Sequence, residues 1–177
     1  MNQRTAEFAN IDEMLAAIAE GNTEALAQLY HRASASVYAF ALSILKNTTD
    51  AEDVLHDCFV SIFTSAGSYR SKGKPMAWIL TITRNLCMKR FQEQQRTSEL
   101  KHQDWNSFAA NDPTASNDDR ILIRECMLSL NDEERQIVIL HAVAGLKHRQ
   151  ISQLLEMPLS TVISKYNRSI KKLKANL

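Results

Sequence analysis

Apolar residues spaced three and four apart are the feature that most constrains the fold of this chain. Early in the sequence they recur along one face of a helix, as in Leu26, Leu29, Val37, Phe40 and Ile44. Only four glycines and three prolines interrupt the 177 residues, so few positions break a helix. We identify no segment with a convincing strand pattern. The sequence therefore predicts an all-α protein.

Breaks between the helical segments predict the domain organisation. Gly21 and Asn22 separate two helices, a turn at residues 47–50 opens a helix that runs to about residue 66, and Pro75 opens a helix over 76–95. Residues 97–117 are polar and irregular, as in a flexible linker, and helix resumes at about residue 118. We therefore expect two small helical domains, residues 1–96 and 118–177, joined by this linker.

Charge is divided into four blocks along the chain. Residues 1–66 carry 3 basic and 9 acidic side chains, and residues 67–103 carry 8 and 2. Residues 104–134 carry 2 and 8, and residues 135–177 carry 8 and 1. Nucleic acid is the usual partner of such basic blocks, because cations bound to phosphates release condensed counterions. The pattern indicates two anion-binding surfaces, although solvated helix faces alone can produce it.

The last thirty residues carry the most specific pattern. A short helix, HRQISQLL, a tight connection, EMPL, and a final helix from about Ser160 predict a helix-turn-helix. Four apolar residues of the final helix share one face and are expected to pack inward: Val162, Tyr166, Ile170 and Leu173. The opposite face displays side chains that can reach bases and phosphates: Thr161, Ser164, Lys165, Arg168 and Lys171. This division favours duplex DNA binding, although an ordinary amphipathic helix shows it too.

The cysteines and histidines do not form the groups that a metal site or a disulfide framework needs. Cys58, Cys87 and Cys126 are widely spaced, and His141 and His148 have no partner ligand near them in the sequence. We expect buried, reduced cysteines and no metal or other cofactor. No Ser/His/Asp set, carboxylate pair or phosphate-binding glycine loop indicates an enzyme or a small-molecule substrate.

Membrane and export signals are also missing from the sequence. No apolar run approaches the roughly 18 residues that a membrane helix needs, and the N-terminal residues lack an apolar signal segment. We therefore expect a cytoplasmic protein.

Segments in both halves resemble the extracytoplasmic-function (ECF) family of bacterial sigma factors. LNDEERQIVILHAVAGLKHRQISQLLEMPLSTVISKYNRSIKKLK resembles the family's promoter-binding C-terminal domain. DAEDVLHDCFVSIF resembles its polymerase-binding helix, and YRSKGKPMAWILTITRNLCMKRF resembles its promoter-melting segment. The resemblance covers about residues 20–95 and 120–175 and implies a protein that binds core RNA polymerase, directs it to promoters and assists their opening.

The resemblance also implies functional residues and partners. Core polymerase would bind an acidic helix through Asp50, Glu52, Asp53, His56 and Asp57. The −10 element of promoter DNA would meet Tyr69, Arg70, Ser71, Lys72, Lys74, Trp78, Arg84, Asn85, Lys89 and Arg90. The −35 element would meet Arg149, Ser160, Thr161, Ser164, Lys165, Arg168 and Lys171. By the same resemblance we expect an anti-sigma factor, often membrane-anchored, to sequester the protein.

Several residues depart from the family's pattern. His56 stands where glutamine is common, Lys147 where a serine or threonine cap is common, and Ile163 where a cation is common. Glu156 occupies a turn position that is usually glycine, where a left-handed backbone costs another residue about 1 kcal/mol. Trp78 fits a core position as well as a DNA contact.

Two other functions fit the same residues. A conventional helix-turn-helix regulator would bind duplex DNA by itself, usually as a dimer on paired half-sites. A helical adaptor that used only the acidic face would show little salt-sensitive affinity for DNA. A sigma factor, by contrast, is expected to bind promoters specifically only together with polymerase.

Overall fold

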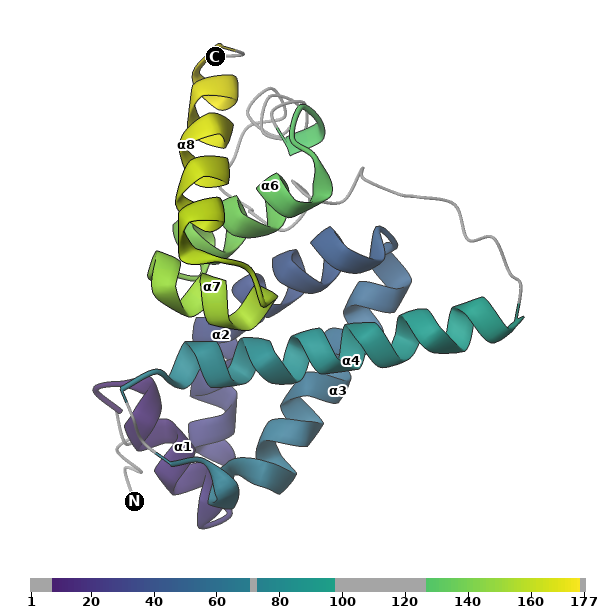
Figure 1. The fold of residues 1–177 in the computed structure, drawn as a ribbon. Coiled ribbons are helices and arrows are strands. Elements are labelled where there is room, and N and C mark those ends of the chain that lie inside the picture. The colour runs from purple at the N-terminus through teal and green to yellow at the C-terminus, as the bar shows by residue number, and fades with distance from the viewer. Residues whose placement is uncertain (1–7, 71–72, 98–126, 176–177) are drawn as a thin grey trace, which may run out of the picture.

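A computed structural model describes residues 8–70, 73–97 and 127–175 of the chain. Every regular element within these ranges is a helix, and the ranges contain no strand (Figure 1). The all-α prediction is therefore confirmed. Other predictions lie outside the described residues: the linker at 97–117 except Thr97, the start of the second domain at 118, Ser71, Lys72 and Cys126.

Asparagine caps open the first three helices. These are α1 (Ile11–Ala19), α2 (Thr23–Leu45) and α3 (Thr48–Ser65). The side chains of Asn10, Asn22 and Asn47 each accept a hydrogen bond from the backbone N–H three residues ahead, at 2.9–3.0 Å. Each cap satisfies a donor that has no partner inside its helix. Gly21, with φ of 86°, forms the predicted break between α1 and α2.

Helix α2 is central to the first half of the chain. It packs against α1, α3 and α4 (Pro75–Thr97), and the short 3-10 helix η1 (Ala66–Ser68) follows α3 (Figure 1). Side chains from all four α-helices are fully buried in the core between them, among them Met14, Leu29, Phe40, Ile62 and Ile79. Pro75 opens α4, as predicted, because the first helical residue needs no N–H donor.

The second half contains the predicted helix-turn-helix. Its elements are α6 (Asp132–Val138), the π-helical turn η2 (Ile139–Val143), α7 (His148–Leu155) and α8 (Leu159–Ala175). Asn131 and Glu134 form a capping box, with hydrogen bonds of 2.9 and 3.1 Å. Gly145, with φ of 71°, follows η2 and ends the helical run. The π-helical turn itself is not a feature that the sequence predicted.

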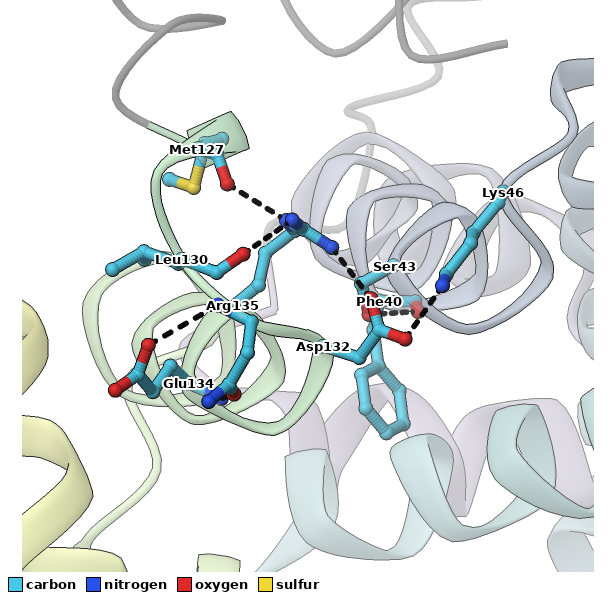
Figure 2. A network of polar contacts seen from close by, with 9 residues as sticks. Phe40, Ser43, Lys46, Met127, Leu130, Asp132, Glu134 and Arg135 are labelled. Atoms are coloured by element: carbon cyan, nitrogen blue, oxygen red, sulfur yellow. Dashed lines mark hydrogen bonds and ion pairs between the residues drawn. The ribbon is translucent and has the colours of Figure 1, made fainter. Parts of the chain in front are cut away.

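Arg135 organises the start of α6 (Figure 2). Its side chain donates to the carbonyl oxygens of Met127 and Leu130, at 2.9 and 2.6 Å, and pairs with Asp132 at 3.0 Å. Lys46, at the end of α2, pairs with the other oxygen of Asp132 at 2.5 Å (Figure 2). A single buried arginine therefore donates hydrogen bonds to two backbone carbonyls. It also pairs with Asp132, which forms a second ion pair with Lys46 of α2.

The helix-turn-helix elements pack onto the first half of the chain. Helices α6 and η2 contact α2, and α7 contacts α4 (Figure 1). Ser36 in α2 donates a hydrogen bond to the carbonyl of Val143 at 3.3 Å. One continuous set of buried apolar residues runs through both halves, from Met14 in α1 to Val162 in α8.

Glu156 has the left-handed backbone that its position in the family pattern predicted, with φ of 57°. We expect Glu156→Gly to raise the free energy of unfolding by about 1 kcal/mol, because glycine adopts this conformation without the side-chain clash. The ion pair with Arg84, at 3.4 Å, is lost, but the Glu156 side chain is 75% exposed and the pair contributes little. Urea unfolding followed by circular dichroism measures the change. Glu156→Ala loses the same ion pair but keeps the strain, so equal stability of the two variants would contradict this account.

Candidate nucleic-acid and protein interfaces

The outward face of α3 carries four of the five residues that the sequence assigned to polymerase binding. Glu52, Asp53, His56 and Asp57 are all exposed. The inward face carries apolar residues, with Val54, Phe59 and Ile62 buried and Leu55 partly buried. The amphipathic pattern of α3 therefore places these polar and acidic side chains on a face that a partner can reach.

Apolar side chains extend this outward face. Val60 and Phe63 are 50% and 41% exposed, and they lie one and two turns beyond His56 on the same side of α3. Tyr30 of α2 is also exposed, and its ring packs on Phe59 with centroids 4.8 Å apart. Sequence reasoning missed these three residues. The available signal was that Val60 and Phe63 fall outside the inward stripe of α3, and adjacent exposed apolar side chains mark interaction sites.

Asp50 and Arg90 differ from the sequence-based assignment. Asp50 is only 2% exposed and does not share the outward face of α3. Its carboxylate lies 3.3 Å from Nε of Arg90 in α4, and the same guanidinium pairs with Asp53. The sequence placed Asp50 at the polymerase and Arg90 on DNA, because it shows charges but not how α3 and α4 cross.

The loop before α4 and the start of α4 form one wall of a groove. Tyr69 packs on Trp78 with ring centroids 5.1 Å apart, and its hydroxyl donates to Asp12 at 2.7 Å. Trp78 is partly buried, so the packing and binding interpretations of this residue remain compatible. The groove has a volume of about 380 Å³, and its other wall is α7. Its lining includes Tyr69, Arg70, Lys74, Trp78, Gln150 and Gln153.

Further along α4, the predicted strand-binding residues differ in their surroundings. Asn85 and Lys89 are exposed. Arg84 is half-buried and pairs with Glu156 of the helix-turn-helix. The cations of α4 therefore do not form one uniform stripe.

Helix α8 shows the predicted inward and outward faces. Val162 is buried, and Tyr166, Ile170 and Leu173 are partly buried. The exposed residues include Ser160, Ser164, Arg168 and Lys171, and Arg149 is exposed on α7. A helix with polar and cationic side chains on its open face suits the major groove of duplex DNA.

Two lysines of α8 are held by acidic residues of α6. Lys165 pairs with Glu133 and Lys172 with Glu134, both at 2.7 Å. Burial raises the pKa of Glu134, but the hydrogen bonds from Lys172 and from the backbone of Asn131 outweigh it, and the pKa lies below its usual value. Lys165, which the sequence assigned to DNA, therefore also joins α8 to α6.

Lys147 shows how α7 begins without the usual serine or threonine cap. Its side chain has no acceptor atom, so it cannot bond the free N–H groups of the first turn. Instead its own backbone N–H donates to the side chain of Gln150 at 2.8 Å. Half of a capping box is thus retained.

Three aromatic rings pack together inside the helix-turn-helix. His141 and His148 stack with centroids 4.5 Å apart, and Tyr166 lies 4.6 and 4.8 Å from them. Burial lowers the pKa of His148, and the neighbouring His141 lowers it further. The three rings therefore join η2, α7 and α8, which carry His141, His148 and Tyr166.

The two described cysteines are not reactive groups. Cys58 and Cys87 are buried, and burial raises the pKa of their thiols to about 11 and about 12. A thiol with such a pKa stays protonated near neutral pH, so it is a poor nucleophile and metal ligand. Within the described ranges, histidine, cysteine and acidic side chains nowhere gather in threes as metal ligands would.

Of the helices that the structure describes, none combines the length and the apolar character needed to cross a membrane.

The helix-turn-helix has an exposed cationic face, and one of its helices, α7, lines a groove with aromatic and basic residues. This combination defines a DNA-binding protein. Comparison with known families identifies its kind. Residues 29–97 match Sigma-70 region 2, and residues 120–173 match Sigma-70 region 4. The chain belongs to the ECF family of RNA polymerase sigma factors.

Individual relatives agree with this assignment. The chain is 30% identical over 174 residues to the ECF RNA polymerase sigma factor SigK of Mycobacterium sp. strain KMS, covering 93% of this chain and 89% of the relative. It is 26% identical over 172 residues to SigK of Mycobacterium ulcerans strain Agy99, covering 93% and 92%. These alignments span nearly the whole of each protein.

Solved structures share the fold. The sigma factor RpoE, crystallised with the anti-sigma factor NepR from Bartonella quintana, matches with a TM-score of 0.65 and 21% identity, over 84% of this chain and 94% of that chain. CnrH, in complex with the cytosolic domain of CnrY, matches with a TM-score of 0.60 and 22% identity, over 94% and 96%.

Proposed function

We propose that this sigma factor divides its work between two helical domains, residues 1–96 and 118–177. The first binds core RNA polymerase and holds the separated strand of the −10 element, and the second reads the −35 element as duplex DNA. The observation that carries this proposal is the match of both halves, in order, to the two regions of the sigma family. The protein would make no covalent bond itself, and would act in the cytoplasm.

The outward face of α3 is the proposed surface for core polymerase. Its acidic residues would attract and orient a basic partner, while apolar neighbours would supply the desolvated centre of the interface. We assign to it Glu52, Asp53, His56 and Asp57, and add Val60 and Phe63 on the basis of their exposure. Asp50 is left out, because its carboxylate is buried against Arg90.

The groove beside α4 is the proposed surface for the −10 strand. Single strands are held by cationic grooves together with aromatic side chains on which bases stack. We assign to this surface Tyr69, Arg70, Lys74 and Trp78 of the groove, Arg84, Asn85 and Lys89 further along α4, and Ser71 and Lys72, which lie outside the described residues. Tyr69 and Trp78 supply the aromatic surface, and the arginines and lysines supply the positive charge.

Helix α8 is the proposed reader of the −35 element. Its exposed hydroxyls and cations would meet base edges and phosphates, with Arg149 of α7 at the flank. The assigned residues are Arg149, Ser160, Thr161, Ser164, Lys165, Arg168 and Lys171.

This division of work is tested by Arg168→Ala combined with Lys171→Ala. We expect the holoenzyme to bind its promoter about tenfold more weakly, because two exposed cations of α8 no longer meet DNA. Affinity for core polymerase, measured by fluorescence anisotropy, should not change. Lys174→Ala removes an exposed cation further along the same helix and serves as the control. Weaker binding to core polymerase in the double variant would contradict the separation of the two surfaces.

An anti-sigma factor is the second partner that we propose, either free or membrane-anchored. Both similar solved structures are complexes, RpoE with the anti-sigma factor NepR and CnrH with the cytosolic domain of CnrY. Affinity capture of the tagged protein from its own unstressed cells, followed by mass spectrometry, would test this. Recovery of core polymerase and no other stoichiometric partner would contradict it.

A further inference from the structure

Arg90 connects two helices that the proposed function assigns to different partners. It lies on α4, whose neighbouring residues are assigned to the −10 strand. Its guanidinium, however, reaches two carboxylates of α3, Asp50 at 3.3 Å and Asp53. These acids are three residues apart on α3, so one side chain of α4 can reach the buried Asp50 and the exposed Asp53 together.

Because Asp50 is buried, this ion pair is expected to contribute to the stability of the fold. The Asp50 side chain is 2% exposed, and a buried carboxylate without a compensating charge is strongly destabilising. Arg90 is itself mostly covered, with 28% of its side chain exposed. The pair therefore links α3 to α4 inside the domain, at a point where neither charge is fully hydrated.

The geometry of arginine matters for the second contact. A guanidinium presents several donors in a fixed fork. Nη2 of Arg90 donates a hydrogen bond to Asp53, whereas Nε lies 3.3 Å from the Asp50 carboxylate as an ion pair without hydrogen-bond geometry. Asp53 is 53% exposed and belongs to the proposed polymerase-binding face. Arg90 thus holds a surface carboxylate of α3 in a defined position while its other side neutralises a buried one.

We propose that Arg90 is a positioning residue, which clamps α4 to α3 and holds Asp53 in place for core polymerase, and that it does not contact promoter DNA. The inference rests on the proposed function for the identity of the two faces. Through this clamp, polymerase bound to α3 would also fix the orientation of α4 and its strand-binding residues. Lys89, the exposed neighbour of Arg90, remains a DNA contact.

The first test measures the clamp on the free protein. Arg90→Gln should lower the urea midpoint of unfolding, because the buried carboxyl group of Asp50 loses the cation that lies 3.3 Å from it. Adding Asp50→Asn should restore most of that loss, since both charges are then gone. Losses that simply add in the double variant would overturn the inference, and this outcome does not depend on polymerase.

The second test titrates the Asp50→Asn, Arg90→Gln variant protein with core polymerase. Its affinity for core polymerase should fall about fivefold to tenfold, whereas Arg90→Lys, which keeps the charge, should lose less. Unchanged core affinity would reduce Arg90 to a purely structural role and overturn the positioning inference.

The salt dependence of binding to a single-stranded −10 oligonucleotide separates positioning from DNA contact. The double variant should keep the wild-type slope, while Lys89→Gln should reduce it by about 0.7, the value for one phosphate contact on a single strand. A reduced slope in the double variant would make Arg90 a DNA contact and overturn the inference. Failure of the wild-type holoenzyme to bind this strand would instead contradict the proposed function, while the stability test still decides the clamp.

Discussion

Arg135→Met is expected to lower the free energy of unfolding by about 3 kcal/mol. The arginine side chain is only about 5% exposed, and it donates to the carbonyl oxygens of Met127 and Leu130. Methionine fills much of the same space but provides no donor. The Leu130 carbonyl loses its bond from Arg135 in a buried site, at about 1–3 kcal/mol, and the Met127 carbonyl keeps only its 3.3 Å bond from the Leu130 N–H. Urea unfolding followed by circular dichroism measures the loss.

Asp132→Asn is the matched control for Arg135. It alters the same network (Figure 2), but the Asp132 side chain is 51% exposed, and the bonds from Arg135 to the two carbonyls remain. We expect a loss of about 1 kcal/mol or less, as for other exposed ion pairs. Equal losses from the two substitutions would show that the buried carbonyls, and hence Arg135, do not dominate this network.

Val60→Ala combined with Phe63→Ala is expected to weaken binding to core polymerase by about 30-fold or more. Truncation of an aromatic side chain at the centre of an interface commonly costs 2 kcal/mol or more, which is about 30-fold in affinity. The fold should survive, because both side chains are about half exposed in the free protein. Titration of labelled protein with core polymerase gives the affinity.

Phe91→Ala provides the control for this pair. Phe91 lies on α4 and is 43% exposed, close to the 41% of Phe63, so its truncation removes a similar amount of surface. It lies outside the proposed polymerase-binding face, and core affinity should stay within about twofold of wild type. If the α3 variant also bound core polymerase normally, the apolar half of this face would have no part in the interface.

Helices and their ends were predictable because their signals are local. Gly21 and Pro75 act within one turn of the chain, and the structure places the break and the helix start as predicted. The left-handed backbone of Glu156 followed from its position in a family pattern. Inward faces of α3 and α8 followed from their apolar spacing.

Partners of individual charges were not predictable, because they depend on how helices cross. The sequence placed Asp50 and Arg90 on two different surfaces, and the crossing of α3 and α4 brings them together. Likewise, Lys165 appeared free for DNA, but α6 presents Glu133 to it. Exposure of Val60 and Phe63 also depends on which neighbours leave α3 uncovered. The ion pairs Asp50–Arg90 and Glu133–Lys165 join residues 30 to 40 positions apart, so they leave no local pattern in the sequence.

Run-off transcription tests the central claim most directly. Purified core RNA polymerase would be supplied with genomic promoter fragments from the protein's own source, with and without the protein. The sigma-factor account predicts discrete transcripts that appear only when the protein is present. An absence of such transcripts, together with tight, sequence-specific binding of duplex DNA by the protein alone, would contradict it and indicate a conventional helix-turn-helix regulator.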